Sequence, residues 1–191
     1  MNIIQKITGL VLLLVSLACA LNAELHTSEL ATHKGFYIEP KLSYTLGESL
    51  SHGGSVLDGH SGYGIGFDFG YSFTEYFALE VDGTYSESDV TETTSAGVST
   101  TSEASFYTYG VNSVFTYPMS NHFILLGKLG YGVEHEDLGH IGLIGSENGA
   151  TWAAGIEYSF NPHVEVSLEY EGADIISARG DSIQVGLIYK F

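Results

Sequence analysis

The chain has 191 residues, of which 23 are Asp or Glu and 6 are Lys or Arg, so its formal net charge is −17. So few cations exclude sequence-independent binding of nucleic acid, which depends on neutralising phosphates, and a single cysteine excludes an internal disulfide framework. The 13 Tyr and 10 Phe exclude a disordered chain, because disordered segments are poor in aromatic residues.

The N-terminal residues have the pattern of a secretory signal peptide over residues 1–23. An apolar run at 9–17, too short to be a convincing membrane span, precedes small residues in an A-x-A arrangement at 18–20. We expect cleavage after residue 20 or after residue 23. A short polar leader, residues 24–34, follows and connects to the rest of the chain.

A lipid anchor at Cys19 is the alternative interpretation of this segment. The bacterial lipobox requires a branched aliphatic residue three positions before the cysteine, and Ser16 occupies that position. Either cleavage by a signal peptidase would remove Cys19, and the protein is exported in both cases.

From residue 35 to residue 191 apolar and polar residues alternate with a period of two, as in strands with two different faces. Eight such segments can be marked, each of about 10 to 14 residues and long enough to cross a bilayer as a tilted strand. They are residues 35–47, 61–73, 76–87, 104–117, 122–134, 150–160, 163–173 and 182–191. Pro40 lies within the first segment, where it removes a ladder hydrogen bond and predicts a bulge or an interruption in pairing.

The connections between these segments alternate in length. Three are tight turns, at residues 74–75, 118–121 and 161–162. Four are longer and rich in Gly, Ser, Thr, Asp and His, at residues 48–60, 88–103, 135–149 and 174–181. Short turns at one end and long loops at the other are typical of an outer-membrane barrel. The second long loop is rich in Ser and Thr and low in complexity, which is typical of a solvated surface loop or an exposed contact surface.

The charged residues of the eight segments all lie on the face opposite the large apolar side chains. They are Glu39, Lys41, Asp68, Glu80, Asp82, Lys128, Glu134, Glu157, Glu165, Glu169, Glu171 and Lys190. A soluble sandwich or lipocalin-like barrel also alternates, but its large apolar side chains point inward. Here the charged face is rich in Gly and Ala and the apolar face carries the bulk, as lipid outside the barrel requires.

Three segments resemble a known family: residues 35–38 (GFYI), 62–67 (GYGIGF) and 185–191 (VGLIYKF). On these, residues 35–191 resemble the small OmpA-like outer-membrane proteins. The resemblance implies an all-β fold, an eight-stranded antiparallel up-and-down transmembrane β-barrel. It also implies a location in the cell outer membrane, with outer-membrane lipids and lipopolysaccharide as partners.

The C-terminal strand has a second implication in this family. A terminal Phe preceded by alternating apolar residues resembles the signal that the barrel-assembly machinery reads, and Tyr189 and Phe191 fit that pattern. An exposed terminal strand can add to a sheet edge of the insertase.

An eight-stranded barrel is just wide enough to be filled by its own side chains. We therefore expect a charge and hydrogen-bond network in the lumen, formed by Glu39, Lys41, Asp68, Glu80, Asp82, Lys128, Glu157, Glu165, Glu169 and Lys190. The twelve charged positions comprise nine carboxylates and three lysines. Because of that surplus of negative charge, a narrow, cation-preferring pore is an alternative function.

We expect no catalytic residue and no cofactor. His163, Glu165 and Ser167 share one strand face, but residues two apart on a strand are roughly 6 to 7 Å apart, too far for a nucleophile–base hydrogen bond. Loop histidines beside carboxylates could bind a divalent metal, although solvated loop histidines are commoner. These weak metal candidates are His52, His60, His135 and His140.

The sequence thus predicts a non-enzymatic integral outer-membrane protein with a structural or adhesin-like surface-interaction role. Its long loops would contact a host or cell-surface ligand, and nucleic acid is not expected as a partner. The alternative is a small pore or carrier for cationic or hydrophobic solutes. An outer-membrane lipid-modifying enzyme is a third and more distant possibility.

Overall fold

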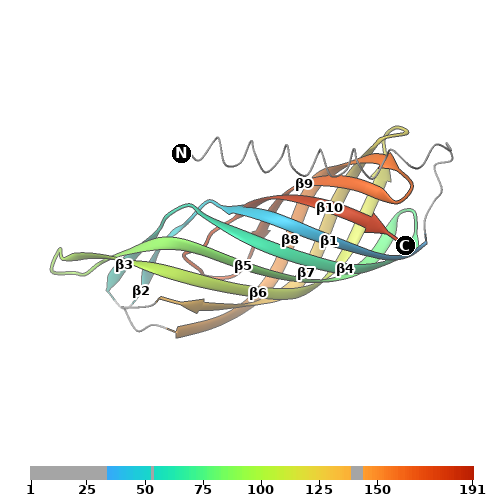
Figure 1. The fold of residues 1–191 in the computed structure, drawn as a ribbon. Coiled ribbons are helices and arrows are strands. Elements are labelled where there is room, and N and C mark those ends of the chain that lie inside the picture. The colour runs from blue at the N-terminus through green and yellow to red at the C-terminus, as the bar shows by residue number, and fades with distance from the viewer. Residues whose placement is uncertain (1–33, 53, 139–143) are drawn as a thin grey trace, which may run out of the picture.

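The computed structural model describes residues 34–52, 54–138 and 144–191, and the regular structure of this part consists of ten β-strands (Figure 1). Eight strands are long: β1 (Gly35–Thr45), β4 (Gly62–Thr74), β5 (Phe77–Thr93), β6 (Ser99–Pro118), β7 (Phe123–Asp137), β8 (Ile144–Asn161), β9 (Val164–Ala173) and β10 (Ser182–Lys190). Two are short: β2 (Ser49–His52) and β3 (Ser55–Gly59).

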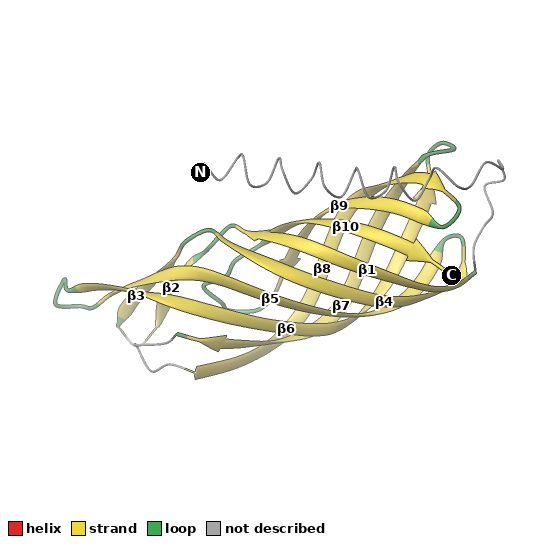
Figure 2. Ribbon diagram, in the orientation of Figure 1, coloured by secondary structure: helices red, strands yellow, loops and turns green. Residues whose placement is uncertain are grey.

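Within the described residues, loops and turns join the strands directly (Figure 2). No helix in that part of the chain is long and apolar enough to cross a membrane. The expected signal peptide, the leader as far as residue 33, and His140 lie outside the described residues.

The eight long strands form a closed ring. Each pairs antiparallel with the long strands before and after it in the chain, β5 pairs with β6, and β1 pairs with β10 to complete the circle. The predicted eight-stranded antiparallel barrel is therefore confirmed. Its short turns lie at one end, called here the short-turn end, and its longer connections lie at the long-loop end.

Three of the predicted long loops are wrong, because the structure forms strands there. Within residues 135–149, β7 continues to Asp137 and β8 begins at Ile144, so strands occupy both ends of that predicted loop. Within residues 88–103, β5 continues to Thr93 and β6 begins at Ser99, so that only residues 94–98 form a turn. The first loop, predicted at residues 48–60, contains β2 and β3, and β3 pairs with the end of β5. The physical reason is that Thr is a β-branched residue that favours strands, so a Ser/Thr-rich composition does not distinguish a loop from an extended hairpin.

Pro40 interrupts one of the two pairings of β1, as predicted. The ladder between β1 and β10 includes Ile38 and Lys41 but not the two residues between them, while the ladder to β4 is continuous. The register on the two sides of the gap is the same, so the proline removes pairing without shifting the strands.

The barrel interior is polar in its middle and apolar near both ends. Buried charged and hydroxyl side chains fill the middle. At the short-turn end the inward apolar side chains form one cluster, Tyr37, Ala78, Val114, Leu126 and Ile188. At the long-loop end a second cluster contains Leu57, Val90, Ala104, Phe106, Leu138 and Ala178.

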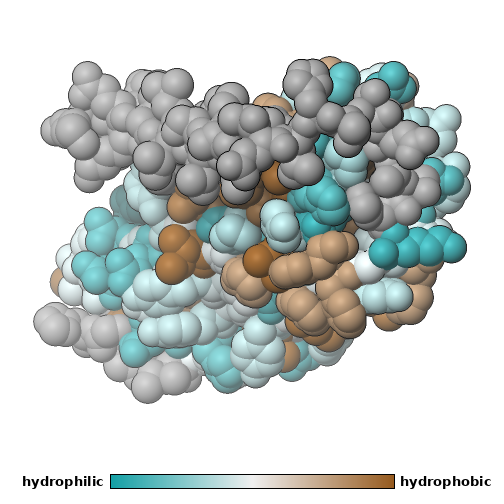
Figure 3. All heavy atoms as spheres, turned by 45° about the vertical axis from the view of Figure 1, so that its right-hand side comes forward, coloured by the Kyte–Doolittle hydropathy of each residue, from teal (hydrophilic) through white to brown (hydrophobic). Residues whose placement is uncertain are grey.

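The outer face carries large apolar side chains over the barrel's middle (Figure 3). Aromatic residues form two girdles on this face. Toward the long-loop end they are Tyr44, Tyr63, Tyr85, Tyr107, Tyr109, Tyr131, Trp152 and Tyr170, and toward the short-turn end they include Phe36, Phe73, Phe77, Phe115, Tyr117, Phe123, Tyr158, Tyr189 and Phe191. An apolar band between aromatic girdles matches the outer surface of a membrane barrel.

Candidate functional site

A lysine on β7 lies at the centre of a buried cluster of charges inside the barrel, called here the central cluster. The Nζ of Lys128 lies 2.8 Å from Glu80 Oε1 and 3.0 Å from Asp68 Oδ2. It also lies 3.2 Å from Glu169 Oε2 and 3.9 Å from Glu39 Oε2. All five side chains are buried. Because a buried carboxylate is costly unless it is paired, one ammonium group here stabilises carboxylates from β1, β4, β5 and β9.

A second lysine shares one of these carboxylates. Lys41 Nζ lies 2.6 Å from Asp68 Oδ2, and the Tyr37 hydroxyl donates to Glu80 Oε2 at 2.8 Å. The central cluster therefore holds four carboxyl groups and two ammonium groups. The hydrogen bond from the Tyr37 hydroxyl on β1 stabilises this cluster further.

Glu39 depends on a small neighbour for its position. The Ser167 hydroxyl donates to the Glu39 carboxylate. A Cβ at Gly186, on the adjacent strand β10, would collide with that carboxylate. Glycine at this position therefore makes room for a charged side chain beside the gap that Pro40 leaves in the ladder.

The same acids form a grouping that could hold a metal ion. One oxygen from each of Glu39, Asp68 and Glu80 lies within 4.8 Å of the others. Lys128 Nζ lies within 3.9 Å of all three, so its ammonium group supplies positive charge where a metal ion would lie.

The candidate metal-binding histidines make other contacts. His60 Nε2 lies 3.0 Å from the Thr91 hydroxyl, and His135 Nε2 lies 3.4 Å from the Tyr109 hydroxyl. The two partner hydroxyls lie on different strands, Thr91 on β5 and Tyr109 on β6. The side chain of His52 lies outside the described part of the structure, as does His140.

A separate ion pair lies in the lumen near the short-turn end. Lys190 Nζ lies 2.7 Å from Glu165 Oε2, and Glu157 is buried nearby in the charge environment of both. His163 Nδ1 lies 2.9 Å from the Lys190 backbone oxygen, whereas Ser167 donates to Glu39. His163, Glu165 and Ser167, the three residues considered for catalysis, thus each contact a different partner.

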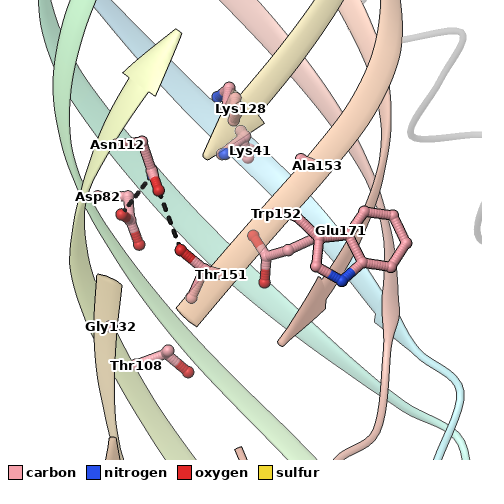
Figure 4. Close-up of a pocket in the computed structure, with 10 residues that line it drawn as sticks. All are labelled: Lys41, Asp82, Thr108, Asn112, Lys128, Gly132, Thr151, Trp152, Ala153 and Glu171. Carbon is pink, nitrogen blue, oxygen red and sulfur yellow. Dashed lines mark hydrogen bonds between the residues drawn. The ribbon is translucent and has the colours of Figure 1, made fainter. Parts of the chain in front are cut away.

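A small cavity borders the central cluster on the side of the long-loop end (Figure 4). Its volume is about 20 Å³, room for about one water molecule. Asn112 donates to Asp82 Oδ1 at 2.8 Å and accepts from the Thr151 hydroxyl at 3.1 Å. The cavity lining includes Lys41, Asp82, Asn112, Lys128, Thr151 and Glu171.

Arg179, which was not among the predicted site residues, closes the lumen on the long-loop side of this cavity. It comes from the connection between β9 and β10, yet only 3% of its side chain is exposed. Its Nε lies 2.7 Å from Glu134 Oε2, and its Nη2 lies 3.5 Å from Glu171 Oε1. Burial works against its charged form, but these two carboxylates outweigh it and raise the pKa of the Arg179 guanidinium.

Backbone hydrogen bonds aim Arg179 into the barrel. The N–H of Gly47 donates to the Arg179 carbonyl at 3.0 Å, and Leu46 and Glu48 donate to Asp181 and Ala178. The feature of the sequence that could have identified this residue is that Arg179 is the chain's single arginine. A planar guanidinium suits two buried carboxylates better than a lysine does.

The second structural feature at this end is a hairpin that continues past the barrel, called here the projecting hairpin (residues 88–104). Hydroxyl pairs join its strands: Thr91 lies 2.9 Å from Thr101, and Thr93 lies 3.0 Å from Ser99. Its turn is also ordered, because the Thr94 N–H donates to the Val98 carbonyl at 2.9 Å and Gly97 has a φ of 77°. The hairpin is thus a defined extension of the sheet.

The described part of the long-loop end is acidic and has no exposed lysine or arginine. Of the Lys and Arg residues that the structure describes, Arg179 alone belongs to this end, and it is buried. The exposed or half-buried acids around it are Glu48, Asp58, Glu87, Asp89, Glu92, Glu103, Glu136, Asp137, Glu147, Asp174 and Asp181.

Comparisons with known proteins agree with this architecture. The family model described as outer membrane protein beta-barrel domain matches residues 10–191, so the chain belongs to that family. Among curated proteins, no sequence relative matches the chain.

Solved structures show the same fold. OprG from Pseudomonas aeruginosa is similar at 14% identity and a TM-score of 0.66, with 86% of this chain and 99% of that chain covered. Neisserial surface protein A is similar at 14% identity and a TM-score of 0.62, with 82% and 97% covered. Ail of Yersinia pestis is similar at 15% identity and a TM-score of 0.54, with 83% and 100% covered.

The protein is therefore an outer-membrane β-barrel protein. In such barrels the short turns face the periplasm and the long loops face the outside of the cell. The projecting hairpin and the acidic end accordingly lie at the extracellular end, and Lys190 lies at the periplasmic end.

Proposed function

We propose that this protein acts at the cell surface through the structure that projects from its extracellular end. The observation that carries the proposal is the projecting hairpin, whose strands run on in register past the end of β7 and are extended sideways by β3. A binding surface built on a rigid sheet costs less ordering entropy than a disordered loop.

The charge of this end favours a cationic partner. One structure of Ail was solved in complex with the heparin analogue sucrose octasulfate, which is a polyanion. Among the described residues, the extracellular end carries no exposed Lys or Arg, so a sulfated polyanion would meet like charge there. A host or cell-surface protein with a basic segment fits better.

The remaining partners belong to the barrel itself. The aromatic girdles and the apolar band support contact with outer-membrane lipids and lipopolysaccharide. Tyr189 and Phe191, whose rings pack 5.2 Å apart at the end of the last strand, support recognition by the barrel-assembly machinery. The central cluster serves as an internal structural network that needs no cofactor.

Replacement of residues 89–103 by a tight two-residue turn tests this function. We expect bacteria that carry the shortened protein to lose attachment to surfaces coated with a basic protein, while attachment to heparin stays absent in both strains. A gel comparing unboiled and boiled samples checks that the shortened barrel still folds. Equal attachment of both strains would refute the proposal.

A narrow cation pore is the second candidate, favoured by the surplus of carboxylates in the lumen. The apolar clusters at both ends, the small size of the cavity in Figure 4 and buried Arg179 support a closed resting state. Planar-bilayer recordings test this role in the native protein and in Arg179→Met, which removes the guanidinium and keeps most of its bulk. Cation-selective steps in the variant would support a gated pore, and silence in both proteins would exclude it.

A further inference from the structure

The turn between β6 and β7, residues 119–122, lies at the periplasmic end beside the aromatic girdle. The N–H groups of Met119 and Ser120 both donate to the Phe123 carbonyl, at 2.8 and 3.2 Å. The last residue of the turn, His122, is exposed and immediately precedes β7. The turn therefore has a defined conformation at the depth where aromatic belts meet lipid headgroups.

Two contacts fix the ring of His122. It stacks on Tyr158 of the girdle, with the ring centroids 5.6 Å apart and 19° between the ring planes. Its Nδ1 lies 2.9 Å from the backbone carbonyl oxygen of Ser159. Because a carbonyl oxygen only accepts, Nδ1 carries the proton, and Nε2 of the neutral imidazole is then a hydrogen-bond acceptor. The exposed ring thus presents an acceptor whose direction the protein fixes.

The same arrangement occurs after another short turn of the barrel. His163 immediately precedes β9, and its Nδ1 lies 2.9 Å from the Lys190 carbonyl oxygen. Its ring stacks on Tyr189 with 28° between the planes. His163 is half-buried and His122 is exposed, so His122 is the more accessible of the two.

Ser120 supplies a complementary group two residues before His122. Its hydroxyl oxygen accepts from the His122 N–H at 3.4 Å and from the Phe123 N–H at 3.2 Å. A hydroxyl has two acceptor lone pairs and one proton, so the group that it can offer to a further partner is its proton. The turn therefore presents one donor and one acceptor, both on exposed side chains.

The lipid that fits this pair carries a donor and an acceptor in one headgroup. A phosphoethanolamine headgroup offers an ammonium N–H to Nε2 of His122 and phosphate oxygens to the Ser120 hydroxyl, and hydrogen bonds to charged groups are the stronger ones. A choline headgroup has the same phosphate but no N–H. Residues 117–124 (YPMSNHFI) contain no Lys, Arg, Asp or Glu, so the turn itself does not select a lipid with net charge.

We propose that Ser120 and His122 bind the headgroup of a phosphatidylethanolamine in the periplasmic leaflet of the outer membrane. Nε2 of His122 accepts from the lipid ammonium group, and the Ser120 hydroxyl donates to the lipid phosphate. This inference rests on the lipid contact proposed above for the aromatic girdles and specifies one headgroup in one leaflet. It is independent of attachment at the extracellular end.

Lipid retention measures this preference. The purified protein is placed in nanodiscs of equal amounts of phosphatidylethanolamine and phosphatidylcholine with the same acyl chains. The lipids that stay bound after transfer to detergent are then counted by native mass spectrometry. We expect phosphatidylethanolamine to be retained about threefold over phosphatidylcholine, the ratio that one hydrogen bond of ordinary net strength provides.

A ring substitution tests the acceptor directly. His122→Phe keeps a ring that can stack on Tyr158 and removes both nitrogens, so we expect the retention ratio to fall to about one. His135→Phe is the matched control, because His135 also packs on a girdle tyrosine but lies toward the opposite end, and it should keep the native ratio. A gel comparing unboiled and boiled samples checks that each variant folds.

The native protein gives a second readout that needs no variant. An imidazole nitrogen that accepts a hydrogen bond changes its ¹⁵N chemical shift. We expect the Nε2 signal of His122 to differ between nanodiscs of phosphatidylethanolamine and nanodiscs of phosphatidylcholine, and the Nε2 signal of His135 to be the same in both.

Three results would overturn the proposal: equal retention of the two lipids by the native protein, an unchanged ratio in folded His122→Phe, or the same His122 Nε2 shift in both lipids. Preferential retention of phosphatidylglycerol over phosphatidylethanolamine would also overturn it, because the turn would then select an anionic lipid. A native protein that is stable in nanodiscs of both lipids but retains them equally keeps its lipid contact through the girdles. Failure of the headgroup site is thus distinguishable from failure of the lipid contact.

Discussion

The membrane-embedded half of β5 and β6 and their projecting half show opposite arrangements of polarity on one continuous pair of strands. In the embedded half, Val81 and Val111 face outward, and Glu80 and Asn112 face the lumen. In the projecting half, hydroxyl and carboxylate groups face outward, while Val90 and other apolar side chains pack together inside.

The comparison shows that the surrounding solvent determines which face of a strand is apolar. Lipid outside requires large apolar side chains on the outer face and tolerates charge inside if it is paired. Once the strands enter water, the ordinary hydrophobic arrangement returns. Arg179 lies near this transition, between the apolar cluster of the long-loop end and the small cavity.

The largest effect is expected from removing the lysine of the embedded half. Lys128→Met leaves the central cluster without the ammonium that contacts its carboxylates, and we expect a loss of about 3–5 kcal/mol in the free energy of unfolding. Urea titration of the barrel in detergent or lipid measures it. Lys190→Met, whose side chain is 22% exposed and contacts Glu165, is the control and should cost less. Equal losses of unfolding free energy would show that the buried position of Lys128 does not make it more important for stability than Lys190.

A local loss is expected from the apolar core of the projecting half. Phe106→Ala removes a fully buried ring and should destabilise that half by about 3 kcal/mol. Because the cluster lies at one end, amide exchange should rise in β2, β3 and the projecting hairpin while the embedded strands stay protected. A uniform rise over all eight long strands would contradict the division into two halves.

One type of substitution distinguishes the two outer surfaces. Val81→Arg places a charge on the lipid-facing side of β5 and should cost about 2 kcal/mol or more in unfolding free energy. Thr100→Arg, on the exposed part of β6, should change it by less than about 0.5 kcal/mol. Similar costs at both positions would mean that the projecting hairpin also lies in lipid.

The smallest effect concerns the hydroxyl pairs of the hairpin. Thr91→Val keeps the shape and β-propensity of the side chain but loses the contacts to His60 and Thr101. We expect a local loss of about 1 kcal/mol, seen as faster amide exchange at the tip only. Unchanged exchange would show that backbone pairing alone holds the hairpin.

The eight long strands could be predicted because lipid imposes one rule, apolar outside and polar or small inside, on every crossing segment. The same rule placed Lys128 and its carboxylates on one face. Their mutual contacts could not be predicted, because Lys128 on β7 meets Glu80 and Asp68 across the lumen and no local pattern encodes that approach.

The regions beyond the membrane were harder to predict. There the alternation loses its aromatic and aliphatic residues, and a Thr-rich strand has the composition of a loop. Arg179 was missed for a different reason. Its direction depends on backbone hydrogen bonds between residues 46–48 and 178–181, which are far apart in the sequence.

The pairing of β1 with β10 has a consequence for the order of folding. Tyr37 pairs with Lys190, so the ring closes only when segments more than a hundred residues apart meet. Loop closure over such a distance costs entropy before any ladder bond repays it, which makes closure a late step. The chain can therefore remain open, with free strand edges, until its last strand is in place.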